Sequence, residues 1–140
     1  MPCHYRRRIA PPSLGVFQNS PCTCDPVSDC LFCKIRDGEI PGDLVYEGDS
    51  VLAFNDINPQ APTHVLIIPR EHIATLNDLE PKHSDVVGEM HLVAQQIARE
   101  RDHAEDGYRT VFNCNAAAGQ TVFHIHLHLL GGRNLGWPPG

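Results

Sequence analysis

The stretch His124-Ile125-His126-Leu127-His128-Leu129-Leu130 has histidine at positions 124, 126 and 128. Side chains of a β-strand alternate between its two faces, so a strand here would place all three imidazoles on one face. The aliphatic side chains between the histidines would point to the other face, which must pack against apolar groups. A helix would instead scatter the histidines around its circumference. The stretch therefore predicts a strand, ended by Gly131-Gly132, with one buried face and one chemically active face.

Three neutral imidazoles within a few ångströms of one another suit two kinds of chemistry. They can bind a transition metal, or one can attack an electrophile while another moves protons. The alternative is a strand whose histidines only face solvent, but three histidines in strict alternation indicate a function. The rest of the chain must separate the metal hypothesis from the nucleophile hypothesis.

The composition favours one globular domain of modest acidity. The chain has 140 residues, of which 41% are hydrophobic, enough for an ordinary core. Its longest unbroken aliphatic run, residues 65–68, is far too short to span a membrane. The formal charge is −6, and residues 30–140 carry 8 basic and 15 acidic side chains. Proteins that follow a nucleic-acid backbone depend on Lys and Arg, so this balance argues against nucleic-acid backbone binding.

Residues 1–29 hold five prolines and no hydrophobic period, so we expect a flexible N-terminal extension before a domain at 30–140. No long apolar segment near the N-terminus suggests secretion, and we expect a cytoplasmic location. Arg6-Arg7-Arg8 resembles part of a mitochondrial presequence, which makes mitochondria the alternative. In a reducing compartment the six cysteines would be thiols or metal ligands.

The order of the remaining elements predicts an α+β domain with a mainly antiparallel sheet. Gly48-Asp49-Ser50 suits a hairpin turn between two strands, and Val86, Met90, Val93 and Ile97 recur at helical spacing. The expected elements are a short helix after Cys30 that ends at Asp37-Gly38, strands over 44–47, 51–54, 64–68 and 109–114, and a long helix from Pro81 to about His103.

The run from Gly119 to Arg133, which contains the three histidines, closely resembles the signature of the histidine triad (HIT) family. Residues 56–64, residues 67–73 and the ending Trp137-Pro138-Pro139-Gly140 resemble, in order, its Hint branch of nucleoside phosphoramidases. The resemblance implies the HIT fold over residues 30–140, a five-stranded, mainly antiparallel sheet with one long and one short helix. It also implies a homodimer that joins two such sheets.

The resemblance implies hydrolysis of the P–N bond of purine nucleoside (adenosine) 5'-phosphoramidates through a nucleotidyl-histidine intermediate. The central histidine, His126, is the expected nucleophile, because a neutral imidazole is a competent nucleophile near pH 7. His128 on the same face can hydrogen-bond the phosphate and help to protonate the departing amine. Thr121 stands where the family has a serine and could relay that proton. His64, by its family position, lies beside the nucleophile and orients it.

Nucleotide binding requires an apolar slot for the base and polar groups for the ribose and phosphate. The chain has no Walker loop and no carboxylate cluster suited to magnesium, so we expect no catalytic metal. Backbone N–H groups of residues 119–121 would then hold the phosphate, and Asp56 would accept the ribose hydroxyls. Asn55 departs from the histidine of animal Hint proteins. The expected nucleotide-binding residues are Leu31, Phe32, Ile35, Ile40, Phe54, Asn55, Asp56, Ile57, Asn113, Gly119, Gln120, Thr121, His126 and His128.

A structural zinc site is also predicted. The spacing of Cys30 and Cys33 allows one turn of chain to present both sulfurs to a metal, and His72 and His124 are available to complete the site. Zinc-bearing members of the wider family use this Cys-Cys-His-His arrangement. The alternatives are that the two cysteines are empty thiols, or that Cys22-x-Cys24 replaces a histidine ligand.

Other functions stay open at this point. An adenylyl-group remover of the aprataxin-like branch would need a basic DNA surface, which the acidic body does not supply. A sugar-phosphate nucleotidyltransferase of the galactose-uridylyltransferase branch would have glutamine in place of His128. A dinucleoside polyphosphate hydrolase and a non-catalytic nucleotide-binding protein are further alternatives.

Overall fold

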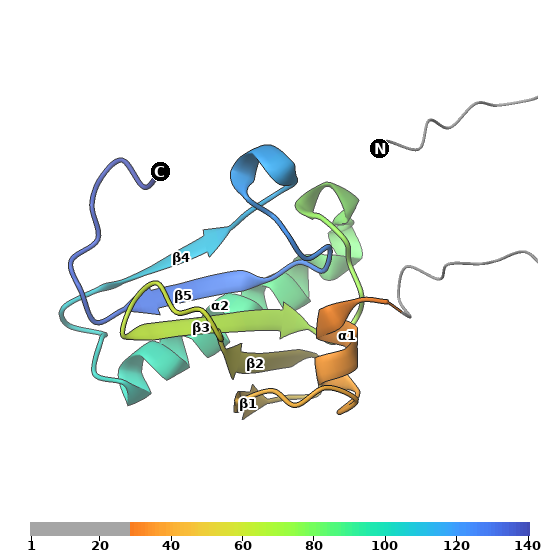
Figure 1. The fold of residues 1–140 in the computed structure, drawn as a ribbon, viewed down its shortest axis with the longest axis horizontal. Coiled ribbons are helices and arrows are strands. Elements are labelled where there is room, and N and C mark those ends of the chain that lie inside the picture. The colour runs from red at the N-terminus through yellow and green to blue at the C-terminus, as the bar shows by residue number, and fades with distance from the viewer. Residues whose placement is uncertain (1–28) are drawn as a thin grey trace, which may run out of the picture.

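The computed structural model describes residues 29–140, and the expectations for the N-terminal extension and for Cys22 and Cys24 lie outside them. One five-stranded antiparallel sheet has the strand order β1-β2-β3-β5-β4, with two helices packed against it (Figure 1). This confirms the predicted α+β fold. The elements are α1 (Leu31–Arg36), β1 (Leu44–Glu47), β2 (Val51–Asn55), β3 (Thr63–Pro69), α2 (Ser84–Glu100), β4 (Tyr108–Phe112) and β5 (Leu127–Gly131), with 3-10 turns at Leu76–Asp78, Pro81–His83 and Ala116–Ala118.

The central strand β3 is buried along its whole length and separates two apolar layers. Its residues Val65 and Ile67 pack on one face against Met90, Val93 and Ile97 of α2, which runs behind the sheet in Figure 1. The predicted helical stripe therefore does cover the sheet. Truncation of Ile67, Met90 or Ile97, each 0–1% exposed, to alanine would cost about 2–5 kcal/mol of folding free energy.

The opposite face of the sheet carries a smaller layer under α1. Leu66 and Ile68 of β3 alternate with the residues of the larger layer and contact Phe32 and Cys33 of α1. The cavity described below opens beside this second layer, because Phe32, Phe54 and Leu66 belong to both.

The histidine stretch differs from its prediction. The strand β5 begins at Leu127, so His124, Ile125 and His126 precede it. The N–H of Ile125 donates to the carbonyl of Ile73 over 2.7 Å and not to a residue of β3 or β4. The alternation nevertheless holds, because Ile125, Leu127 and Leu129 all enter the layer under α2. A period of two requires an extended chain, and an extended chain does not require a sheet partner on each side.

Smaller differences concern element ends. The long helix begins at Ser84, after the 3-10 turn at Pro81–His83, and ends at Glu100, earlier than expected. The strand β4 ends at Phe112, which leaves Asn113 and Cys114 in the following loop. No helix in residues 29–140 is both long enough and apolar enough to cross a lipid bilayer.

Candidate active site

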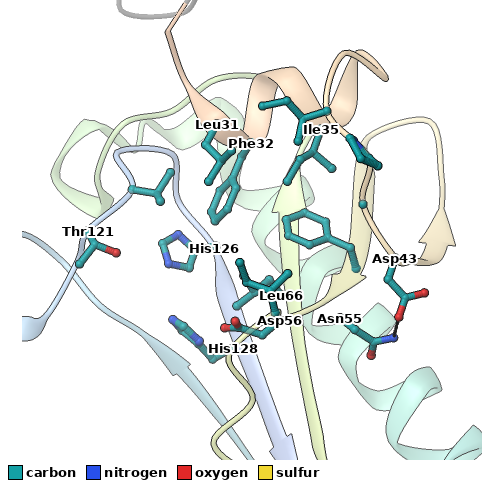
Figure 2. A pocket seen from close by; sticks show the side chains of 16 residues that line it. Leu31, Phe32, Ile35, Asp43, Asn55, Asp56, Leu66, Thr121, His126 and His128 are labelled. Carbon is teal, nitrogen blue, oxygen red and sulfur yellow. Dashed lines mark hydrogen bonds between the residues drawn. The ribbon is translucent and has the colours of Figure 1, made fainter.

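A cavity of about 360 Å³ opens between α1, the segment that follows it, the end of β2, the middle of β3 and the histidine stretch (Figure 2). Phe32 forms part of its apolar wall, where its ring meets Phe54 edge-on with 5.4 Å between ring centroids. It meets the imidazole of His126 in the same way at 5.0 Å. The lining residues are Leu31, Phe32, Ile35, Ile40, Pro41, Gly42, Asp43, Phe54, Asn55, Asp56, Ile57, Leu66, Thr121, Val122, His126 and His128.

His126 has one tautomer fixed by its own backbone. Its Nδ1 lies 2.7 Å from the carbonyl oxygen of His124, and a carbonyl can only accept, so Nδ1 carries the proton. The lone pair is then on Nε2, of a ring that lines the cavity. Burial lowers the pKa of His126, partly opposed by its hydrogen bond to the carbonyl and by the Asp56 carboxylate. At neutral pH the ring is therefore the uncharged form, which is nucleophilic.

The tautomers of His64 and His128 follow from a chain of hydrogen bonds. The N–H of Gln60 donates to Nδ1 of His64 over 3.0 Å, which leaves the proton of His64 on Nε2. That Nε2–H donates to Nδ1 of His128 over 2.9 Å, so His128 must carry its proton on Nε2. Burial lowers the pKa of His64, and burial followed by the neighbouring imidazoles lowers the pKa of His128 to about 4.

The Nε2–H of His128 is buried and finds no acceptor among residues 29–140. An unpaired buried donor costs about 1–3 kcal/mol of folding free energy, so its presence in a native structure calls for an explanation such as a role in ligand binding. Because the His128 ring lines the cavity and lies 4.9 Å from the His126 ring, centroid to centroid, a ligand bound at His126 can supply the missing acceptor.

Asp56 connects the histidine chain with the rest of the cavity. One carboxylate oxygen accepts the N–H of Asn58 over 2.9 Å, and the other lies 3.4 Å from Nε2 of His64. Asp56, His64 and His128 thus bring three ligand-type atoms within 4.8 Å of one another. The hydrogen-bond chain already accounts for the short distance between the two imidazoles.

A second cluster has the composition of a metal site. Cys30, Cys33, His72 and His124 place one ligand atom each within 4.8 Å of one another. Nδ1 of His124 lies 3.6 Å from Sγ of Cys30 and 3.5 Å from Sγ of Cys33, and Nδ1 of His72 lies 3.3 Å from Sγ of Cys33. Sulfur and nitrogen ligands of a tetrahedral zinc ion are separated by about 3.6 Å, given bonds of roughly 2.3 and 2.0–2.1 Å.

The protonation of this cluster also suits a cation. Nε2 of His124 lies 2.8 Å from the carbonyl oxygen of Pro69 and must donate to it, so the lone pair of Nδ1 points toward the sulfurs. Burial lowers the pKa of His124 to about 4, which keeps the ring neutral and able to ligate. Burial raises the pKa of the Cys33 thiol to about 11, with a smaller contribution from the neighbouring Cys30. A bound dication would reverse this effect, because it favours the thiolate. The residues present therefore fit a metal ion.

Residues 29–135 match the family described as "Scavenger mRNA decapping enzyme C-term binding". The chain belongs to the histidine triad (HIT) family. A HIT family hydrolase from Legionella pneumophila is similar in structure, with a TM-score of 0.79 and 54% identity, over 80% of this chain and all of that one.

Two curated relatives bear on the two clusters. The purine nucleoside phosphoramidase of Escherichia coli K12 is 54% identical over 108 residues, which is 77% of this chain and 91% of that protein. A protein of Zea mays named "14 kDa zinc-binding protein" is 49% identical over 115 residues, 81% of this chain and 89% of that protein. The chain is thus a HIT hydrolase with a phosphoramidase among its relatives.

Most of the residues expected at the nucleotide line the cavity of this HIT domain, and three do not. Asn113, Gly119 and Gln120 are outside the cavity lining. The amide of Gln120 is buried, where it accepts the N–H of Asn115 over 2.8 Å and donates to the carbonyl of Ala74 over 2.8 Å. Gln120 therefore holds the loop that presents Thr121 to the cavity.

Several lining residues were not predicted, namely Pro41, Gly42, Asp43, Leu66 and Val122. Gly42 lets the chain pass close over Ile35, because an added Cβ would lie 2.7 Å from its Cγ2. A Pro-Gly pair directly after Ile40 was the available signal for this close approach. Asp43 had no signal in the sequence, since acidic residues are common in exposed turns.

Proposed function

We propose that the protein hydrolyses the P–N bond of purine nucleoside 5'-phosphoramidates through a covalent intermediate on His126. The observation that carries the proposal is the fixed tautomer of His126, whose Nδ1–H donates to the carbonyl of His124 over 2.7 Å. An unprotonated Nε2 in an apolar cavity, beside a buried donor without an acceptor, suits attack on an anionic phosphorus centre. The 54% identical phosphoramidase of Escherichia coli supports the same substrate class.

In the first half-reaction Nε2 of His126 attacks the phosphorus, a P–Nε2 bond forms and the bond from phosphorus to the amine nitrogen breaks. The amine nitrogen keeps the electron pair and needs one proton, because an amide ion is a very poor leaving group. The Nε2–H of His128 and the Thr121 hydroxyl, both at the cavity, pass it from solvent. The positive charge that develops on the His126 ring is stabilised at Nδ1–H by the carbonyl of His124.

In the second half-reaction a water attacks the same phosphorus, and the P–Nε2 bond breaks. The electron pair returns to Nε2, so His126 regains its starting state. The proton lost by the water leaves by the path that supplied the amine. The net reaction consumes one water and yields a nucleoside monophosphate and a free amine.

The cavity also has the features that a nucleotide needs. The apolar wall formed by Leu31, Phe32, Ile35 and Phe54 suits the face of a purine ring. Asp56 lies beside His128 in the cavity lining, where its carboxylate can accept ribose hydroxyls (Figure 2).

We further propose that Cys30, Cys33, His72 and His124 bind one structural zinc ion. Four protein ligands would leave no open coordination position, so the role of the ion is to fix α1 against the sheet. We also propose a homodimer, because Trp137 is 83% exposed in the single chain and tryptophan is a preferred interface anchor.

The test of the main proposal is turnover of adenosine and guanosine phosphoramidates by the full chain and by His126→Ala. Loss of the nucleophile should lower kcat by ~10³-fold or more and abolish the covalent adduct, since the attacking atom disappears. His91→Ala is the matched control, because His91 is an exposed histidine of α2 outside the cavity. A His126→Ala protein that still forms the adduct would refute the assignment, and dinucleoside polyphosphates in the same panel would reveal a different hydrolase.

A further inference from the structure

A chain of side-chain hydrogen bonds links the end of α2 to the cavity through Asn55. The guanidinium of Arg101 donates from Nη2 to Oδ1 of Asn55 over 2.9 Å. The amide nitrogen Nδ2 of Asn55 donates to Oδ2 of Asp43 over 2.7 Å. Because Arg101 can only donate, Oδ1 of Asn55 must face it, and the amide nitrogen must face Asp43. The Arg101 contact therefore fixes which way the amide of Asn55 points.

Asp43 is held by two bonds and keeps one oxygen free. Besides the side-chain bond, the backbone N–H of Asn55 donates to the carbonyl of Asp43 over 2.9 Å. No hydrogen bond within residues 29–140 engages Oδ1 of Asp43, whose side chain lines the cavity. Within residues 29–140 the one other carboxylate in the lining is that of Asp56, which already accepts the N–H of Asn58 and lies near His64. Asp43 is thus the available acceptor at its end of the cavity.

That end is opposite the reacting histidines. Figure 2 shows Asp43 and Asn55 on one side of the cavity and His126 with Thr121 on the other, with Leu66 and Asp56 between them. A nucleotide with its phosphorus at His126 and its ribose near Asp56 must extend its base toward Asp43. The edge of a purine farthest from its glycosidic nitrogen is the Watson–Crick edge, which is the edge read by hydrogen bonds when enzymes bind single bases.

We propose that Asp43 accepts hydrogen bonds from the Watson–Crick edge of the base and makes guanine the preferred purine. Guanine presents two adjacent donors there, N1–H and the N2 amine. The free Oδ1 of Asp43 can accept one of them, and Oδ2, which already accepts from Asn55, has a second lone pair for the other. Adenine presents the N1 lone pair beside a single amine, and that lone pair faces the carboxylate unfavourably. The inference rests on the proposed function where it concerns the reaction. The preference for one base is a property of binding and does not depend on hydrolysis.

The kinetic experiment compares guanosine, inosine and adenosine 5'-phosphoramidates that share one amine. For the wild-type chain, kcat/KM should be about tenfold higher for the guanosine than for the adenosine substrate. This ratio is the low end of the range expected for a hydrogen bond to a charged acceptor, because the side chain of Asp43 is exposed. Inosine has N1–H but lacks the N2 amine, so its value should fall between the two.

Asp43→Asn is the decisive variant. The introduced carboxamide can accept from Asn55 only through its oxygen, so its NH2 group would face the base and oppose N1–H of guanine. The ratio of guanosine to adenosine should fall to about one or below. Asp49→Asn makes the same charge change in the exposed hairpin turn outside the cavity and should leave the ratio unchanged. A wild type that prefers adenosine, or an Asp43→Asn ratio equal to that of the wild type, would overturn the proposal.

Calorimetric binding of GMP, IMP and AMP to the same three proteins separates this inference from the reaction itself. The order of affinities should follow the order of kcat/KM. If the wild type binds GMP most tightly and Asp43→Asn loses that preference, Asp43 reads the base even if no phosphoramidate is hydrolysed. Equal affinities for GMP and AMP would refute the role of Asp43, whatever the enzyme hydrolyses.

Discussion

The first half-reaction should keep its rate at pH values where an ordinary histidine is mostly protonated. Burial lowers the pKa of His126, the proposed nucleophile, and lowers the pKa of its neighbour His128 to about 4. At pH 5.5 an imidazole with the usual pKa of about 6.5 would be roughly 10% neutral, whereas one with a pKa near 4 would be about 97% neutral. A lowered pKa delays protonation as the pH falls, so the neutral form is lost only near the lowered value. Because the pKa of His126 is lowered, we expect kcat/KM to fall between pH 7.5 and 5.5 by clearly less than the roughly tenfold loss that an unshifted histidine nucleophile would give.

The quantity to measure is kcat/KM at substrate concentrations well below KM, because its pH profile reports the ionisation of the free enzyme. Enzyme kept at pH 7.5 would be diluted into each assay buffer, and circular dichroism in the same buffers would show that the fold persists. Amine release would be followed directly, so that the second half-reaction does not enter. A fall in kcat/KM centred near pH 6.5 would show that a catalytic histidine has an ordinary pKa, and would refute the reasoning from burial.

Three further predictions concern other residues. Cys33→Ser should lose about one zinc ion per chain in elemental analysis and have a Tm lower by more than about 5 °C. Cys114→Ser, at a thiol outside the cluster, should change neither the zinc content nor the Tm. Wild-type protein that contains no metal when prepared without chelator would contradict the zinc site. Trp137→Ala should raise the dimer dissociation constant in light scattering, and an active wild-type monomer at micromolar concentration would exclude the dimer. His64→Ala should lower kcat by about 10–100-fold with little change in KM, because His64 fixes the tautomer of His128 without touching the substrate. An unchanged kcat would show that His64 has no role in the mechanism.

The parts of the fold that the sequence predicted are those specified by local periodicity. The stripe of Met90, Val93 and Ile97 identified α2 and the face it buries. The hairpin turn after β1 and the short helix after Cys30 were likewise found, because turn and cap residues act over a few positions. The observed ends of these elements differ from the predicted ends by a few residues, because hydrogen bonding at the end of an element depends on neighbours in space.

The parts that could not be predicted depend on contacts between distant segments. Asn55 was expected at the base pocket, but its orientation depends on Arg101, 46 positions away in the chain. Asp43 lines the cavity directly after Gly42, where the chain passes close to Ile35, and a lone acidic residue in a turn gives no sign of this. The free Nε2–H of His128 could not be foreseen either, because it follows from the hydrogen bond between Gln60 and His64.

The departure of the histidine stretch from a full strand explains how the nucleophile is oriented. Within a sheet ladder, the carbonyl of His124 would accept a backbone N–H from a neighbouring strand. Because β5 begins only at Leu127, that carbonyl is available to accept Nδ1–H of His126 over 2.7 Å and set its tautomer. His124 itself is held by its Nε2–H, which donates to Pro69, and its Nδ1 faces the sulfurs of the metal-type cluster. At the residue without a strand partner, the backbone carbonyl therefore serves the reacting imidazole, while the buried side chain of His124 is fixed by its hydrogen bond to Pro69.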